Sequence, residues 1–146
     1  GFVHDEASAF IGGLAGNAGL FSTARDVARV YQMLLNGGEI DGQRYLSKET
    51  CQLFTTETSK ISRRGLGFDK PDADDPKKGN CASAAPAGVY GHTGFTGTCA
   101  WVDPVNELVY VFLSNRIYPD VTNRKLNQLH IRERIQGAIY DAMKKK

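Results

Sequence analysis

A first amphipathic helix is predicted near the start of the chain, where apolar residues recur every three or four positions. The residues of this apolar face are Val27, Val30, Tyr31, Leu34 and Leu35. Thr23 and Asp26 precede the face at the spacing of a capping box, and Asn36-Gly37-Gly38 follows as a stop signal. We therefore expect one helix between these signals, with its apolar face toward a core.

Two further helices are predicted, one from a capping signal and one from the spacing of apolar residues. After a turn at Asp41-Gly42, Ser47 is placed to cap a short helix that runs through Phe54. A long helix to the C-terminus is indicated by a last set of apolar positions at helical spacing. These positions are Ile131, Ile135, Ala138, Ile139 and Ala142, and the basic tail of residues 144–146 complements the helix dipole.

From Val89 onward the pattern changes to that of strands. Residues 99–102 are short and rich in strand-forming side chains, and residues 103–106 have turn chemistry. Residues 108–113 read LVYVFL and are apolar at every position, which predicts an interior strand covered on both faces. The expected fold class is α+β: a small antiparallel sheet with the C-terminal helix on one face and the early helices on the other.

Residues 57–88 form a long polar segment that separates the helical part, 1–56, from the strands and last helix, 89–146. It contains Pro71, Pro76 and Pro86 and one possible strand at residues 65–68. Long loops in compact domains often lie near a site, but a surface excursion explains the segment equally well. The chain opens GFVHDEASAF, without an initiator Met, and we expect a single fragment of a longer protein.

Composition excludes several classes of function. The 146 residues are 41% hydrophobic and carry a net charge of +2, which favours a globular domain without strong attraction to nucleic acid or membranes. No apolar run reaches membrane-spanning length. Cys51, Cys81 and Cys99 are too widely spaced for a zinc knuckle, and an odd number argues against a disulfide framework. We expect buried free thiols at Cys51 and Cys99, and no cofactor or metal.

The stretch GHTGFTG, residues 91–97, places three glycines around a histidine and two threonines. Glycine weakens a strand unless the chain bends or a ligand approaches the main chain closely. Its GxxG spacing also occurs in RNA-clamping loops, but the basic helix and net charge of those domains are missing here. The adjacent ligand-type residues His4-Asp5-Glu6 cannot all point at one metal ion, so a hydrogen-bonded turn is expected there.

The segment GHTGFTGTCAWVDPVNELVYVFLSNRIYP, residues 91–119, resembles the third signature of the serine β-lactamase and penicillin-binding protein superfamily, in its class C-like branch. That branch includes D-alanyl-D-alanine carboxypeptidases and esterases. Residues 15–38 and 113–119 resemble the branch's helix and last strand, in the same order. The resemblance covers nearly the whole chain and the C-terminal part of the family, and it implies a β-lactamase/transpeptidase-like fold.

The resemblance also implies roles for particular residues. The Phe95 amide would donate to an oxyanion, Gly94 would let substrate lie against the strand, and the Thr93 hydroxyl would contact a substrate carboxylate. His92 would stand where many relatives have Lys, giving a weaker electrostatic anchor and a steeper pH dependence. Two arginines near the last strand are further candidate carboxylate contacts or plain surface residues; they are Arg116 and Arg124. Asn17 is expected to cap backbone groups.

Two family motifs are missing from the sequence. No serine is followed at the third position by Lys, and neither Tyr-x-Asn nor Ser-x-Asn occurs. Thr122-Asn123-Arg124-Lys125 comes nearest, but it has threonine and follows the HTG motif. We therefore expect no catalytic residue in this chain and no acyl-enzyme activity of the chain alone. The first strands of the family sheet are also missing, which would leave an exposed edge prone to self-association.

The sequence thus favours the C-terminal portion of a serine hydrolase that acts by acyl-enzyme chemistry on a carboxylate-bearing amide or ester, such as a β-lactam or a D-Ala-D-Ala-type peptide. By resemblance, it would work in the bacterial cell envelope. His92 in place of Lys tilts the expectation toward a peptidase or esterase. The alternatives are a non-catalytic module that binds cell-wall peptide or a partner strand through the HTG groove, and a purely structural domain.

Overall fold

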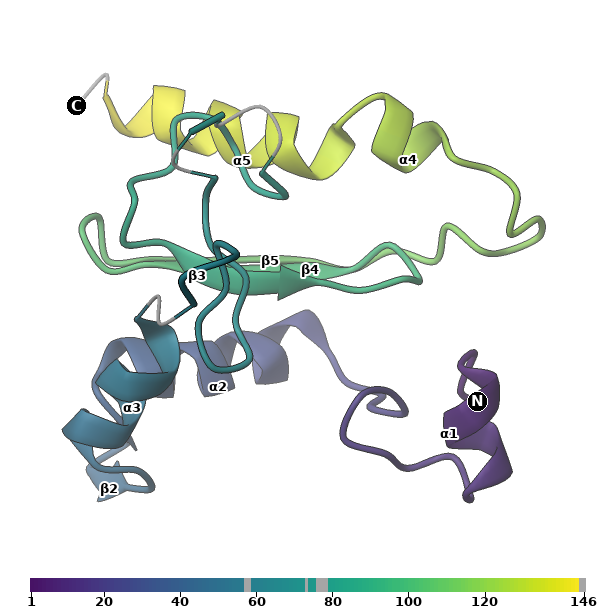
Figure 1. Cartoon of the computed structure of the whole chain (residues 1–146), viewed down its shortest axis with the longest axis horizontal. Helices are drawn as coiled ribbons and strands as arrows, with labels where there is room; N and C mark the ends of the chain where they lie inside the picture. Colours follow the sequence, from purple (N-terminus) through teal and green to yellow (C-terminus); the bar gives the residue numbers. More distant parts are fainter. Residues whose placement is uncertain (57–58, 73, 76–78, 145–146) are drawn as a thin grey trace.

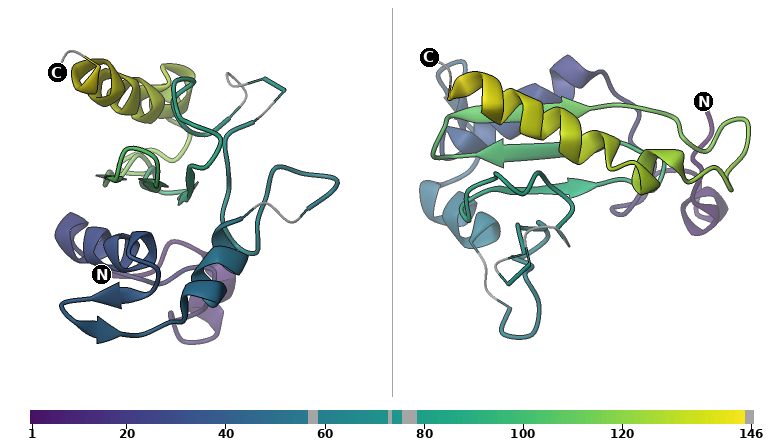
Figure 2. Two further views of the ribbon diagram at one scale, coloured as in Figure 1. Left: turned by 90° about the vertical axis from the view of Figure 1, so that its left-hand side faces the viewer. Right: turned by 90° about the horizontal axis from the view of Figure 1, so that it is seen from above.

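The fold consists of three layers, with helices on both faces of a central sheet (Figure 1). The computed structural model describes residues 1–56, 59–72, 74–75 and 79–144. Helix α2 (Ala24–Leu35) covers one face of the sheet and helix α5 (Ile131–Met143) covers the other, as the end-on view in Figure 2 shows. This arrangement confirms the predicted α+β class and the placing of early and late helices on opposite faces.

The sheet is antiparallel, with strand order β3-β4-β5 among the described residues. Its strands are β3 (Tyr90–Thr93), β4 (Cys99–Asp103) and β5 (Leu108–Phe112). The prediction of an interior strand at residues 108–113 is wrong in one respect. Strand β4 is central and buried at every position, whereas β5 is half-buried because no strand of the described part pairs with its far edge.

Helix α2 begins and ends where the sequence predicts. The Thr23 hydroxyl accepts a hydrogen bond from the Asp26 amide at 3.2 Å, and Asn36 is the C-terminal cap. The helix contacts β4 and β5. Val30, however, is 56% exposed, because it lies at the margin of the apolar stripe rather than at its centre.

A short hairpin and a third helix follow α2. Strands β1 (Glu39–Ile40) and β2 (Gln43–Arg44) pair across Asp41 and Gly42, whose positive φ angles of 52° and 74° match the turn that favours Gly at this position. Helix α3 (Lys48–Thr55) is capped by Ser47, as predicted. The two turn signals and the cap therefore determine the local structure of this region.

Helix α5 buries a face that is turned from the predicted one, and of the predicted residues Ile139 packs against the core. Its buried residues are Arg132, Gln136 and Tyr140, while Ile135 is 39% exposed. Polar contacts explain the change: the Tyr140 hydroxyl donates to Asp103 Oδ2 at 2.9 Å, and the Ala82 amide donates to Gln136 Oε1 at 2.8 Å. Long amphipathic side chains bury their stems and satisfy their polar ends, which a count of apolar positions does not register.

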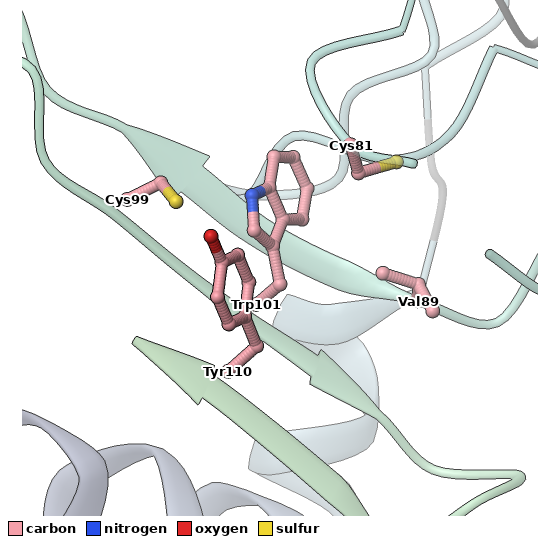
Figure 3. Close-up of a cluster of buried hydrophobic side chains, with 5 residues drawn as sticks. All are labelled: Cys81, Val89, Cys99, Trp101 and Tyr110. Carbon is pink, nitrogen blue, oxygen red and sulfur yellow. The ribbon is translucent and has the colours of Figure 1, made fainter. Parts of the chain in front are cut away.

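The core between the sheet and α5 is small and includes two thiols (Figure 3). Its buried members are Cys81, Val89, Cys99, Trp101 and Tyr110. All three cysteines are free and buried, which confirms the expectation for Cys51 and Cys99. Burial is the main cause that raises the pKa of the Cys81 thiol to about 12 and that of Cys99 to about 11, so both are protonated and unreactive at neutral pH.

Residues 65–68 do not form the predicted strand. The chain folds back there, with the Gly65 amide donating to the Phe68 carbonyl at 3.1 Å, and Asp69 just beyond forms an isolated antiparallel bridge with Gly91. The glycines at 65 and 67 favour this reversal, since Gly67 has a φ of 118°. Pro76 and the end of the basic tail, residues 145–146, lie outside the described residues.

The two remaining helices are short. Helix α1 (Glu6–Phe10) begins at Asp5, whose carboxylate accepts a hydrogen bond from the Ser8 amide at 2.7 Å. The motif His4-Asp5-Glu6 therefore forms a hydrogen-bonded helix start. Helix α4 (Lys125–Gln128) precedes α5, and Arg124 stands at its N-terminus.

Candidate substrate-binding edge

The HTG motif lies on the outer edge of β3. Gly91 uses both backbone groups on its outer side, donating to Asp69 O at 3.1 Å and accepting from Asp69 N at 2.7 Å. Because backbone groups alternate sides along a strand, His92 pairs with β4 and Thr93 faces outward again. Gly91 has no room for a side chain, since a Cβ there would lie 2.7 Å from the Trp101 ring.

A tight turn continues this edge beyond Thr93. Gly94 donates to the Thr98 carbonyl at 2.8 Å, and Gly97 donates to the Gly94 carbonyl at 3.0 Å. A trans peptide points its C=O and N–H in opposite directions, so the Phe95 N–H points away from the turn. Within the part of the chain that the structure describes, no group accepts a hydrogen bond from this amide.

The space beside Gly94 is occupied by the Thr98 hydroxyl. A Cβ at Gly94 would displace this hydroxyl, so glycine lets Thr98 pack against the turn. Phe95 is 65% exposed, and the His4 ring stacks on it with centroids 5.3 Å apart and an interplanar angle of 12°. The turn thus presents a free main-chain donor beside an exposed aromatic ring.

Both ring nitrogens of His92 have partners. Nδ1 lies 2.7 Å from the Thr93 carbonyl oxygen, and Nε2 lies 2.9 Å from Arg64 Nη1. A guanidinium can only donate, so Nε2 is the acceptor of the Arg64 bond. Nδ1 then carries the ring proton and donates a hydrogen bond to the Thr93 carbonyl. The pair places the positive charge of Arg64 beside the HTG motif, at an exposed site.

Arg64 is not predicted from the sequence. It lies 28 positions before His92, in the long polar segment of residues 57–88. The only available signal was the length and polarity of that segment, which does not single out one residue. The contact confirms that the segment adjoins the HTG motif.

Buried Asp69 holds the Arg64 segment against β3. Asp69 is 1% exposed, forms an ion pair with Arg63 at 2.8 Å and accepts a hydrogen bond from the Asn80 amide at 2.7 Å. Burial opposes ionisation of its carboxyl, but the hydrogen bonds from Asn80 and Arg63 outweigh it and hold the pKa below the usual value. We call Asp69 with Arg63, Asn80 and Gly91 the Asp69 latch.

The two other candidate arginines differ. Arg116 does not extend freely into solvent: its Nε donates to the Phe95 carbonyl at 2.7 Å and its Nη1 donates to the Val121 carbonyl at 3.2 Å. Arg124 is exposed at the start of α4, and its side chain has no hydrogen bond or ion pair within the described residues. The structure therefore brings Arg116, but not Arg124, into contact with the HTG turn.

Asn17 has a different partner from the expected one. Its side-chain oxygen accepts a hydrogen bond from the Ser8 hydroxyl at 3.3 Å rather than capping backbone groups. No group of three His, Cys, Asp or Glu side chains in the described ranges is arranged to hold a metal ion. A search of those same residues finds no helix with the length and apolarity to cross a membrane.

Comparison with known proteins identifies the family to which this helix-flanked antiparallel sheet belongs. The model of the family described as Beta-lactamase matches residues 2–133. The chain therefore belongs to the beta-lactamase family.

Three of its relatives share one name, "Putative D-alanyl-D-alanine carboxypeptidase". The chain is 38% identical over 128 residues to the one from Escherichia coli O157:H7 and 37% identical over 128 residues to the one from Escherichia coli strain K12. It is 37% identical over 134 residues to the one from Salmonella agona strain SL483. Each match covers 87% of this chain and spans 29% of the relative's length.

Proposed function

We propose that the β3 edge is the substrate-binding wall of a serine hydrolase of the bacterial cell envelope, which acts on an amide or ester next to a carboxylate. The nucleophilic serine and its lysine base would come from a segment upstream of this chain. The observation that carries the proposal is the free, outward Phe95 amide at the end of an open strand edge. Membership of the beta-lactamase family supports it.

In the proposed reaction the serine oxygen adds to the substrate carbonyl carbon, and its proton passes to the base. Negative charge collects on the carbonyl oxygen, where the Phe95 N–H donates to it. The bond to the leaving group then breaks, the leaving group takes the proton, and an acyl-enzyme remains. Water adds to the acyl carbon and releases the acid and the free serine.

The open edge suits an extended substrate. Beyond Gly91 the outward amides of Thr93 and Phe95 continue the line along which Asp69 pairs, while the Thr93 and Phe95 carbonyls already accept from His92 and Arg116. A peptide-like substrate can add there as a short strand, with main-chain hydrogen bonds giving affinity. Arg64, which is hydrogen-bonded to His92, and the Thr93 hydroxyl are then placed to bind a carboxylate at the end of the substrate.

The first test is labelling with a fluorescent penicillin. We expect the whole protein that contains this chain to form a covalent adduct, and the 146-residue chain by itself to form none, because a missing nucleophile removes several orders of magnitude of rate. A peptide ending in D-Ala-D-Ala and a neutral ester should be assayed in parallel. Failure of the whole protein in all three assays would favour the alternative, a module that binds peptide without catalysis.

A further inference from the structure

We propose that Arg116 is a positioning residue that holds the HTG turn so that the Phe95 amide keeps its outward direction. This inference rests on the proposed function, because it concerns the group that would donate to the oxyanion. The sequence suggested Arg116 as a contact for a substrate carboxylate. The structure instead directs two of its side-chain nitrogens to carbonyls of its own chain.

Three contacts join Arg116 to the turn of residues 94–97. Its side-chain Nε donates to the Phe95 carbonyl at 2.7 Å, and its backbone amide donates to the Thr96 carbonyl at 2.9 Å. Its Cζ lies 4.5 Å from the centroid of the Phe95 ring, within the range of a cation–π contact. Two successive carbonyls and one ring of the same turn are thus held by a single residue.

The position of these contacts in the turn explains their effect. Gly97 donates to the Gly94 carbonyl, which holds the peptide plane that carries the Phe95 N–H. The next plane, between Phe95 and Thr96, is the central peptide of the turn. Type I and type II turns differ by rotation of this central peptide, and no contact within the turn opposes that rotation. The Arg116 Nε bond opposes it from outside, and so holds the peptide plane next to the one that carries the Phe95 N–H.

The turn packs closely against Arg116 on the side of Gly97. A Cβ added to Gly97 would lie 3.3 Å from Arg116 Cβ and 2.9 Å from Leu126 Cδ2. The far end of the Arg116 side chain is itself held by the Val121 carbonyl. Arg116 therefore connects the HTG turn to the segment that leads into α4, and its loss would release the turn on that side.

The test compares Arg116→Gln with wild type in the whole protein. Arg134→Gln is the matched control, because Arg134 is an exposed arginine on α5. A displaced oxyanion donor weakens the transition state but not the bound substrate, so we expect kcat on a neutral p-nitrophenyl ester to fall about 10- to 100-fold with little change in KM. Arg116→Lys, which keeps one donor, should recover part of the loss.

Phenylboronic acid separates positioning from a merely structural role. As a tetrahedral adduct on the serine it mimics the transition state, so its Ki should rise in Arg116→Gln by about the same factor as kcat falls. Partial unfolding would lower kcat while leaving the Ki of the folded fraction unchanged, and that result would overturn the proposal. A loss confined to substrates with a carboxylate would also overturn it, because it would assign Arg116 to substrate binding.

Amide hydrogen exchange tests the inference independently of catalysis. We expect peptides covering residues 93–98 to exchange faster in Arg116→Gln than in wild type, with other sheet peptides unchanged. Equal exchange in the two proteins would refute the positioning role, whether or not the wild type is a hydrolase. An inactive wild type together with faster exchange in the variant would refute the proposed function and support the role of Arg116 in the turn.

Discussion

At the scale of single residues, the proposed site depends on how one positive charge reaches the HTG motif. Here the charge is on Arg64, and His92 connects it to the strand through its two ring nitrogens. The guanidinium also has a fixed, planar set of donors that suits a carboxylate better than an ammonium does.

This arrangement predicts a specific defect in Arg64→Gln. For a peptide ending in a free carboxylate, kcat/KM of the whole protein should fall about 10- to 100-fold, which corresponds to the loss of one hydrogen bond to a charged group. The same peptide with a C-terminal amide should be hydrolysed at an unchanged rate. Steady-state kinetics on this pair measure the effect, with Arg134→Gln as the control. Equal losses on both peptides would contradict a role in carboxylate binding.

At the scale of elements, the Asp69 latch decides where the Arg64 segment lies. The segment makes one bridge to β3, and a buried carboxylate with its polar partners holds it there together with the Phe68 ring, which packs edge-on against Tyr90. Buried polar networks are strong when every member is satisfied and costly when one partner is lost. The Asp69 latch is therefore the polar contact that fixes the segment of Arg64 against β3.

The lowered pKa of Asp69 gives the latch a definite pH dependence. An acid with a depressed folded pKa stabilises the protein above its unfolded value, about 3.9, and this contribution is lost as the pH falls through the folded value. Asp69→Asn should lower stability at pH 7 by about 1–2 kcal/mol, since the Arg63 partner is partly exposed. Thermal unfolding between pH 7 and pH 3 measures it. The difference in stability between wild type and Asp69→Asn should shrink as the pH falls. A difference that stays constant would contradict a lowered pKa of Asp69.

At the scale of the whole molecule, the described sheet has two unlike edges. The β3 edge is partly covered by Asp69 and otherwise carries the HTG motif, whereas the β5 edge has no strand beside it within the described residues. Register places the backbone groups of Val109 and Val111 on that outer side, because Tyr110 pairs inward with Trp101. An open apolar edge is a template for pairing with another strand.

The 146-residue chain by itself should therefore self-associate through β5. We expect light scattering after gel filtration to show a mass above 16.0 kDa that rises with concentration. Val111→Pro removes an outward donor at an edge position where proline is tolerated, and it should shift the chain toward the monomer. A monomeric wild-type chain at all concentrations would show that the β5 edge is protected in some other way.

The sequence by itself determined those parts of the protein that depend on local chemistry. Thr23, Ser47 and the glycines after Asn36 mark helix ends through bonds to residues three to five positions away, so α2 and α3 were predictable. The strands, the α+β class and the HTG motif were likewise visible as short patterns. The order of three matching segments was enough to indicate the family, which the comparison with family models confirms.

Only the tertiary structure decided which strand is central, which face of α5 is buried and what the arginines contact. Each of these depends on partners far away in the chain. The Tyr140 hydroxyl can be buried because it donates a hydrogen bond to Asp103, and Arg64 contacts His92 across 28 positions. The sequence offers Arg116 as a carboxylate contact or a plain surface residue, and in the fold it is bonded to the Phe95 carbonyl. A local pattern records propensity and spacing, whereas pairing across the chain is determined by which groups must satisfy one another once water is excluded.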